Sequence, residues 1–90
     1  MNVKFEKEYV LANNIAVSVE TTGYIEGDAG HGCYTKIVIA DRGSTALFYN
    51  GVELSSKPLE IEIRGGCEYN MLIDIFKDIA IFMEKNNEKR

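Results

Sequence analysis

The chain has few of the residues that stabilise very small domains or bind metals. Its 90 residues include two cysteines, one histidine, one proline and no tryptophan. Two cysteines cannot supply the several disulfides of a small secreted scaffold, so we expect Cys33 and Cys67 to be reduced thiols. One proline and a hydrophobic content of 46% exclude a disordered chain, which would bury too little apolar surface to fold. We expect a single domain over residues 1–90.

The chain also lacks a basic cluster and a long hydrophobic run. Ten lysines and arginines are scattered among 14 acidic residues, and the net charge is −4. Proteins that bind duplex nucleic acid use a basic patch to neutralise phosphates, so duplex DNA or RNA is not an expected partner.

The longest apolar run, near Ile79 to Met83, is far below the roughly 20 residues of a membrane span. Met1 leads into charged residues rather than a signal peptide, and we expect a cytoplasmic protein with no membrane partner.

Apolar and polar residues alternate through most of the first 64 positions with the period of β-strands. Asn50-Gly51 is a strong signal for a type I′ hairpin turn, because both residues tolerate positive φ. The apolar positions of the expected strands are Val3, Phe5, Tyr9, Ile15, Val17, Val19, Ile37, Ile39, Leu47, Tyr49, Val52, Leu54, Leu59, Ile61 and Ile63. The pattern predicts an α+β fold, in which an antiparallel β-meander of five or six strands within residues 1–64 packs against one C-terminal helix.

That helix is expected over residues 67–85, before a polar tail of residues 86–90. Its apolar side chains cover an arc of roughly 200° at 100° per residue, whereas a helix that lies on one sheet needs about 100°. Exposed apolar patches mark interfaces, and association stabilises small domains. We therefore expect a homo-oligomer formed through Met71, Ile73, Ile75, Phe76, Ala80 and Phe82. The alternative is that the strands and the loop cover the helix more fully within one chain.

A glycine-rich loop over residues 23–34 holds half of the eight glycines and the single histidine. Glycines let successive backbone N–H groups turn toward one anion, and tyrosine rings stack on ligand rings. Loops of this length are uncommon in compact domains unless they bind something. The candidate ligand-binding residues are Tyr24, Gly27, Asp28, Ala29, Gly30, His31, Gly32 and Tyr34, together with Arg64 before the N-terminus of the helix. The alternative is a hairpin connection in which the glycines only make the turn.

Other chemistries are open to the same loop. Asp28, His31 and Cys33 are competent metal ligands, with Cys67 as a fourth, and would suit a small metal-dependent hydrolase. A nucleophilic pair of Cys33 and His31 is disfavoured, because residues two apart on a strand lie roughly 6–7 Å apart and a working pair needs about 3 Å. We expect no catalytic residue, no metal and no cofactor.

A pattern within residues 23–45 resembles small phage and prophage proteins. It consists of Gly23-Tyr24, Gly27-Asp28-Ala29-Gly30-His31-Gly32, Thr35, Ile37-Val38-Ile39, Asp41 and Gly43-Ser44-Thr45. Cys33 and Tyr34 stand where that pattern would have a glycine and a basic residue. The resemblance implies an oligomeric, non-catalytic protein, similar in kind to the anti-defence sponges that sequester nucleotide second messengers of bacterial immunity. A phage-encoded protein of this kind would act in the host cytoplasm.

The leading hypothesis is therefore a binding protein that sequesters a small anionic, phosphate-bearing, nucleotide-like ligand. Gly27, Gly30 and Gly32 would supply backbone donors, and His31 and Arg64 would neutralise the charge of the ligand. The alternative is an interaction protein that inhibits a host protein directly through its helix or its loop.

Overall fold

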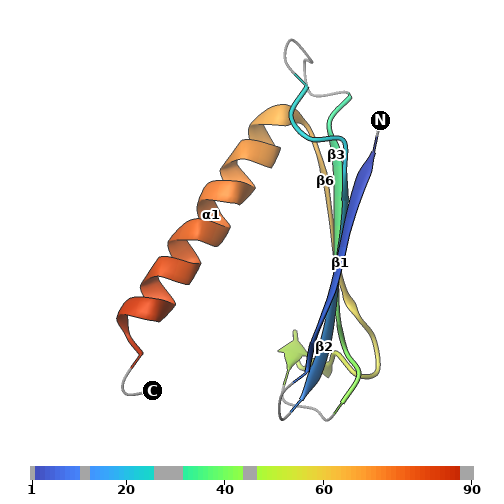
Figure 1. Ribbon diagram of the computed structural model, residues 1–90, viewed down its shortest axis with the longest axis vertical. Helices are drawn as coiled ribbons and strands as arrows, with labels where there is room; N and C mark the ends of the chain where they lie inside the picture. Colours follow the sequence, from blue (N-terminus) through green and yellow to red (C-terminus); the bar gives the residue numbers. More distant parts are fainter. Residues whose placement is uncertain (1, 11–12, 26–31, 44–46, 88–90) are drawn as a thin grey trace.

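Six strands and one helix make up the part of the chain that the computed structural model describes, residues 2–10, 13–25, 32–43 and 47–87. The elements are β1 (Val3–Val10), β2 (Asn14–Thr21), β3 (Tyr34–Asp41), β4 (Phe48–Tyr49), β5 (Val52–Glu53), β6 (Leu59–Arg64) and α1 (Gly66–Lys85) (Figure 1). Four strands form an antiparallel sheet in the order β1-β2-β3-β6, and β4 pairs with β5 apart from it. The predicted α+β class is confirmed, with the meander interrupted by the β4–β5 hairpin.

The register of the four-stranded sheet separates an apolar face from a polar face. Phe5, Val19, Ile37 and Ile61 are consecutive partners across the four strands, and residues two apart along a strand share a face. The apolar face also carries Val3, Tyr9, Ile15, Val17, Ile39, Leu59 and Ile63. The polar face carries Lys4, Glu6, Glu8, Glu20, Tyr34, Lys36, Glu60, Glu62 and Arg64. The alternation of apolar and polar residues in the sequence therefore corresponds to the two faces of this sheet.

The β4–β5 hairpin turns at Asn50-Gly51, as the sequence predicts. Asn50 has φ 51° and Gly51 has φ 80°, and positive φ at both central residues is the signature of a type I′ turn. The Leu54 N–H donates to the Leu47 carbonyl at 3.0 Å, and Leu54 is only 4% exposed. The hairpin lies on the same side of the sheet as α1 (Figure 1). Leu54 is therefore the residue that the hairpin contributes to the small core.

Helix α1 starts against β6 and then diverges from the sheet along its length (Figure 1). Tyr69 and Leu72 are half-buried, whereas every residue from Ile73 to Asn87 is exposed. On β6 the apolar-face residues Leu59, Ile61 and Ile63 are half-buried and the polar-face residues are exposed, so the helix leaves on the apolar side. Within the described residues, no helix has the length and apolar character needed to cross a membrane.

Candidate ligand site at the loop end of the sheet

Four segments meet where the glycine-rich loop leaves the sheet: the end of β2, the start of β3, the end of β6 and the start of α1. The Thr22 N–H donates to the Tyr34 carbonyl at 2.9 Å, and the Tyr34 N–H donates to Thr22 Oγ1 at 3.0 Å. The Gly65 N–H donates to the Cys33 carbonyl at 3.1 Å. These bonds hold both described arms of the loop, residues 22–25 and 32–34, beside the N-terminus of the helix.

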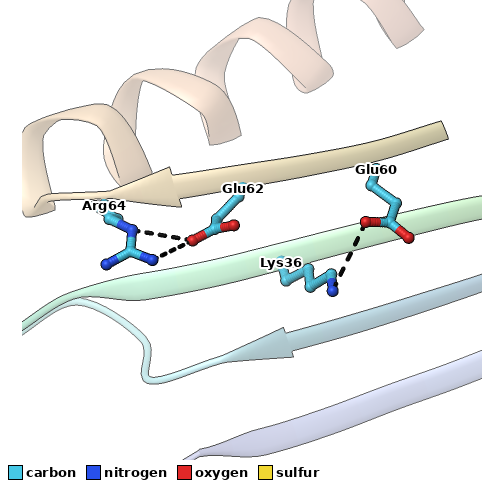
Figure 2. Close-up of polar contacts among 4 residues, drawn as sticks. All are labelled: Lys36, Glu60, Glu62 and Arg64. Carbon is cyan, nitrogen blue, oxygen red and sulfur yellow. Dashed lines mark hydrogen bonds and ion pairs between the residues drawn. The ribbon is translucent and has the colours of Figure 1, made fainter.

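Tyr34 and Arg64 form the polar-face side of this end. They are partners across β3 and β6, and the Arg64 guanidinium carbon lies 5.6 Å from the centre of the Tyr34 ring. Arg64 Nε donates to Glu62 Oε2 at 3.0 Å, and Arg64 Nη2 contacts the same oxygen (Figure 2). The Arg64 side chain is 73% exposed, so a cation lies beside an aromatic ring in contact with solvent.

Cys33 and Tyr24 form the opposite side, toward the helix. Cys33 is 2% exposed, and its Sγ accepts a hydrogen bond from the Ile25 N–H at 3.1 Å. A Cβ on Gly66 would lie 2.8 Å from Tyr24 Cε1 and 3.6 Å from Cys33 Sγ. The absence of a side chain at Gly66 therefore lets the Tyr24 ring lie against the first turn of α1. Burial of the Cys33 thiol makes it a packing group in this arrangement, since a nucleophile must reach its substrate.

The first turn of α1 has no side-chain cap. Gly65 occupies the N-cap position with φ 117°, which favours glycine, and as a glycine it offers no side-chain acceptor to the first-turn N–H groups. Glu68 in the first turn supplies a compensating negative charge. Gly65 and Gly66 are buried, so the helix begins in a covered position at the same end of the sheet as Arg64 but on the apolar side, away from the polar face that carries Arg64.

The candidate residues divide into two groups in the structure. Gly27, Asp28, Ala29, Gly30 and His31 lie outside the described residues. Within them, Tyr24, Gly32, Tyr34 and Arg64 are brought to one end of the molecule. Tyr34 and Arg64 belong to the polar face, while Tyr24 lies against the helix on the other side of the sheet end.

The metal alternative rests on Asp28, His31 and Cys33, of which the first two lie outside the described residues. Cys33 is buried and Cys67, the suggested fourth ligand, is exposed. In the described part of the chain, no three His, Cys, Asp or Glu side chains gather as a metal centre would require. The two cysteines form no disulfide with each other.

A second polar cluster lies at the other end of β3, where sequence reasoning indicated only a turn. Asp41 is 4% exposed, and its Oδ1 accepts a hydrogen bond from the Gly43 N–H at 3.1 Å. Asp41 Oδ2 and Asn14 Oδ1 are buried, with no hydrogen-bond partner among the described residues. Arg42, whose side chain is 63% exposed, pairs with Glu8 at 3.6 Å beside a shallow open hollow of the polar face. The signal for this cluster is an aspartate at the end of a strand, which also fits an ordinary turn.

Comparisons with known proteins add no relative from which a function could be transferred. No family model, no curated protein and no solved structure matches the chain.

Proposed function

We propose that this chain is a non-catalytic binding protein that sequesters a phosphate-bearing, nucleotide-like ligand at the loop end of the sheet. The observation that carries the proposal is the exposed Arg64 guanidinium 5.6 Å from the Tyr34 ring, at the base of the glycine-rich loop. A guanidinium binds phosphate through parallel N–H donors, and an aromatic ring offers a stacking surface for a base. Arginine and tyrosine are therefore suited to the two parts of a nucleotide, its phosphate and its base.

The Glu62 carboxylate competes with such a ligand for Arg64, through a contact that is exposed to solvent. An exposed ion pair contributes about 0–1 kcal/mol, and here the Glu62 side chain is 44% and the Arg64 side chain 73% exposed. A hydrogen bond to a charged group contributes about 1.5–3 kcal/mol. A phosphate can therefore compete with Glu62 for the exposed Arg64 guanidinium. Glycines at positions 27, 30 and 32 add backbone donors in the proposed complex.

The resemblance to phage and prophage proteins gives the proposal a biological setting. In that setting the ligand is a nucleotide second messenger of bacterial immunity, and sequestration without turnover lowers its free concentration in the host cytoplasm. No catalytic residue is needed, because binding alone removes the signal.

The test begins with native mass spectrometry of freshly purified protein, followed by titration calorimetry with mononucleotides and cyclic dinucleotides. Arg64→Gln should weaken binding about ten- to a hundredfold, the equivalent of one charge-assisted hydrogen bond. Glu62→Gln should tighten binding by up to about fivefold, because it releases Arg64 from a pair worth at most about 1 kcal/mol. His31→Ala should weaken binding without unfolding the protein.

Arg42→Gln is the matched control. Arg42 is also paired with a glutamate, and its side chain is 63% exposed, but it follows the opposite end of β3. Its substitution should leave the affinity unchanged. Equal losses for Arg42→Gln and Arg64→Gln would show attraction by overall charge and contradict the proposed site, as would a protein that binds none of the nucleotides.

Direct inhibition of a host protein is a second candidate, favoured by the apolar side chains that α1 exposes. Phe82 is 67% and Met83 is 63% exposed, and contiguous exposed apolar surface marks protein interfaces. A protein that purifies without a ligand and binds no nucleotide, yet copurifies with one host protein in stoichiometric amount, would favour this function over the first.

A further inference from the structure

Helix α1 exposes apolar side chains for most of its length. Eight of them are at least 37% exposed: Met71, Ile73, Ile75, Phe76, Ile79, Ile81, Phe82 and Met83. Seven lie within the broad apolar arc, and Ile81 lies among the polar side chains on the other side of the helix. Most of the stability of a helix in a protein comes from packing of its apolar face. Among the apolar helix residues described after Gly66, only Tyr69 and Leu72 are half-buried and have such packing.

The apolar face of the sheet is also incompletely covered. On β1, the apolar-face residues Val3, Phe5 and Tyr9 are 62%, 50% and 46% exposed. On β2 the apolar-face residues are only half-buried. An antiparallel sheet of this class normally buries one face against helices. Here the only helix of the described chain leaves the sheet after its first turns (Figure 1), so a helix and a sheet face remain open toward each other.

The exposed surface is larger than a monomer of this size would have. The accessible surface is 6938 Å² for a chain of 10.1 kDa, whereas a folded monomer of that mass exposes about 5,300 Å². The radius of gyration is 15.1 Å, against about 12 Å for a compact chain of this length. The excess of roughly 1,600 Å² lies within the range that each subunit of an obligate dimer buries.

We propose that a second copy of this chain occupies the space between α1 and the apolar face, in a two-fold dimer in which each helix packs on the sheet of its partner. The two open surfaces belong to the same chain and are complementary in kind, because helices cover sheet faces in α+β domains. With two-fold symmetry, the exposed helix face and the exposed sheet face of each copy are both covered by the partner, and no such surface is left for a third copy. A helix that more than one surface covers needs an apolar arc wider than about 100°, which is the kind of arc that α1 has.

The distribution of charge permits this contact despite a net charge of −4 per chain. The glutamates of β1, β2 and β6 belong to the polar face, and the aspartates of α1 lie outside the apolar arc. Contact through the apolar face and the apolar arc therefore keeps these acidic side chains outside the contact, and the charged residues that share the apolar face are Lys7 on the edge strand β1 and the buried Asp41 on β3. The dimer is independent of the proposed ligand, and its test does not require one.

The first experiment measures the mass of the purified protein in solution by light scattering after size exclusion, from about 1 to 100 μM. The expected mass is twice 10.1 kDa. Phe82→Lys places a charge in the apolar arc and should shift the protein to monomer mass or unfold it, and either result loses the dimer. A wild-type protein at monomer mass, or a Phe82→Lys variant that keeps the dimer mass, would overturn the proposal.

Ile81→Lys is the matched control, since Ile81 is the neighbouring residue, is 60% exposed and receives the same charge. It lies on the polar side of α1, so the dimer mass and the helical circular dichroism should be unchanged. Equal dissociation by both variants would show that any charge on the helix disrupts the protein, and it would overturn the assignment to the apolar arc.

Isotope-filtered nuclear Overhauser spectra of a dimer mixed from labelled and unlabelled chains locate the contact. Intermolecular signals are expected between the Phe82 ring and the methyl groups of Val17 and Val19 on the apolar face. Intermolecular signals confined to the backbone of an edge strand, β1 or β6, would show an edge-to-edge dimer and overturn the proposed packing.

Discussion

Gly43 shows at the scale of a single residue how tightly the turns at one end of the sheet fit together. A Cβ at this position would lie 2.5 Å from Asn13 Oδ1 and 2.9 Å from the backbone nitrogen of Asn14. The second atom belongs to the backbone at the start of β2, where the Arg42 N–H donates to the Asn14 carbonyl at 2.7 Å. An added methyl group therefore cannot be relieved by moving one side chain.

Gly43→Ala should lower the free energy of unfolding by about 1–3 kcal/mol, the range for overpacking a close contact. The measurement is urea unfolding followed by circular dichroism at a fixed protein concentration. Ser55→Ala, at an exposed position of a turn, is the control and should change the free energy by less than about 0.5 kcal/mol. A Gly43→Ala midpoint equal to that of wild type would contradict the crowding seen between Gly43 and Asn14.

Residue types in the candidate site could be predicted from the sequence, but their partners could not. Glycine spacing and aromatic flanks indicated Tyr24 and Tyr34, and the position before the helix indicated Arg64. The structure brings these three residues to one end of the sheet. The Arg64–Glu62 pair follows from two residues sharing the polar face of β6. The hydrogen bond from the Ile25 N–H to Cys33 Sγ depends on how the two described arms of the loop are placed beside each other. No local sequence pattern specifies that placement.

At the scale of elements, the β4–β5 hairpin depends on one buried side chain. Leu54 is 4% exposed, whereas Val52 on β5 is 46% exposed. Two-residue strands have too few ladder bonds to be stable by themselves, so burial of Leu54 holds the hairpin against the rest of the fold.

Leu54→Ala should therefore lower the free energy of unfolding by about 2–5 kcal/mol, the usual cost of removing a buried leucine side chain. Val52→Ala is the matched control within the same hairpin and should cost less than about 1 kcal/mol, since its side chain is nearly half exposed. Both values come from urea unfolding of the purified variants. Similar losses for the two variants would show that the hairpin is stabilised by its turn and ladder rather than by Leu54.

The elements themselves were largely predictable, because their signals are local. The alternation, the Asn50-Gly51 turn and the expected helix over residues 67–85 agree with the observed strands, the type I′ turn and α1 (Gly66–Lys85). The order of the strands was less accessible, since β6 pairs with β3 across an intervening hairpin. Such a pairing depends on which distant apolar faces meet, and sequence periodicity does not specify it.

At the scale of the whole molecule, the described core is too small for the length of the chain. Its buried apolar residues are Cys33, Ile37 and Leu54. A chain of this length already buries a smaller share of its surface than a large domain does. The wide apolar arc of α1 indicated from the sequence that the helix needs more than one covering surface. The direction in which the helix leaves the sheet emerged only from the structure, because the Gly65-Gly66 junction permits many directions.

A dimer couples folding to association, so its stability should depend on protein concentration. When folded dimers unfold to separate chains, each tenfold increase in concentration adds about 1.4 kcal/mol to the free energy of unfolding. With a urea slope of about 1–3 kcal/mol per molar, the midpoint should rise by roughly 0.5–1.4 M for each tenfold increase. Circular dichroism from about 1 to 100 μM protein measures this shift.

Ile81→Lys should show the same dependence of the midpoint on protein concentration as wild type, while a folded Phe82→Lys monomer should show none. A wild-type midpoint that stays constant over this range would contradict coupled folding and association, because a monomer that unfolds in one step has no concentration term.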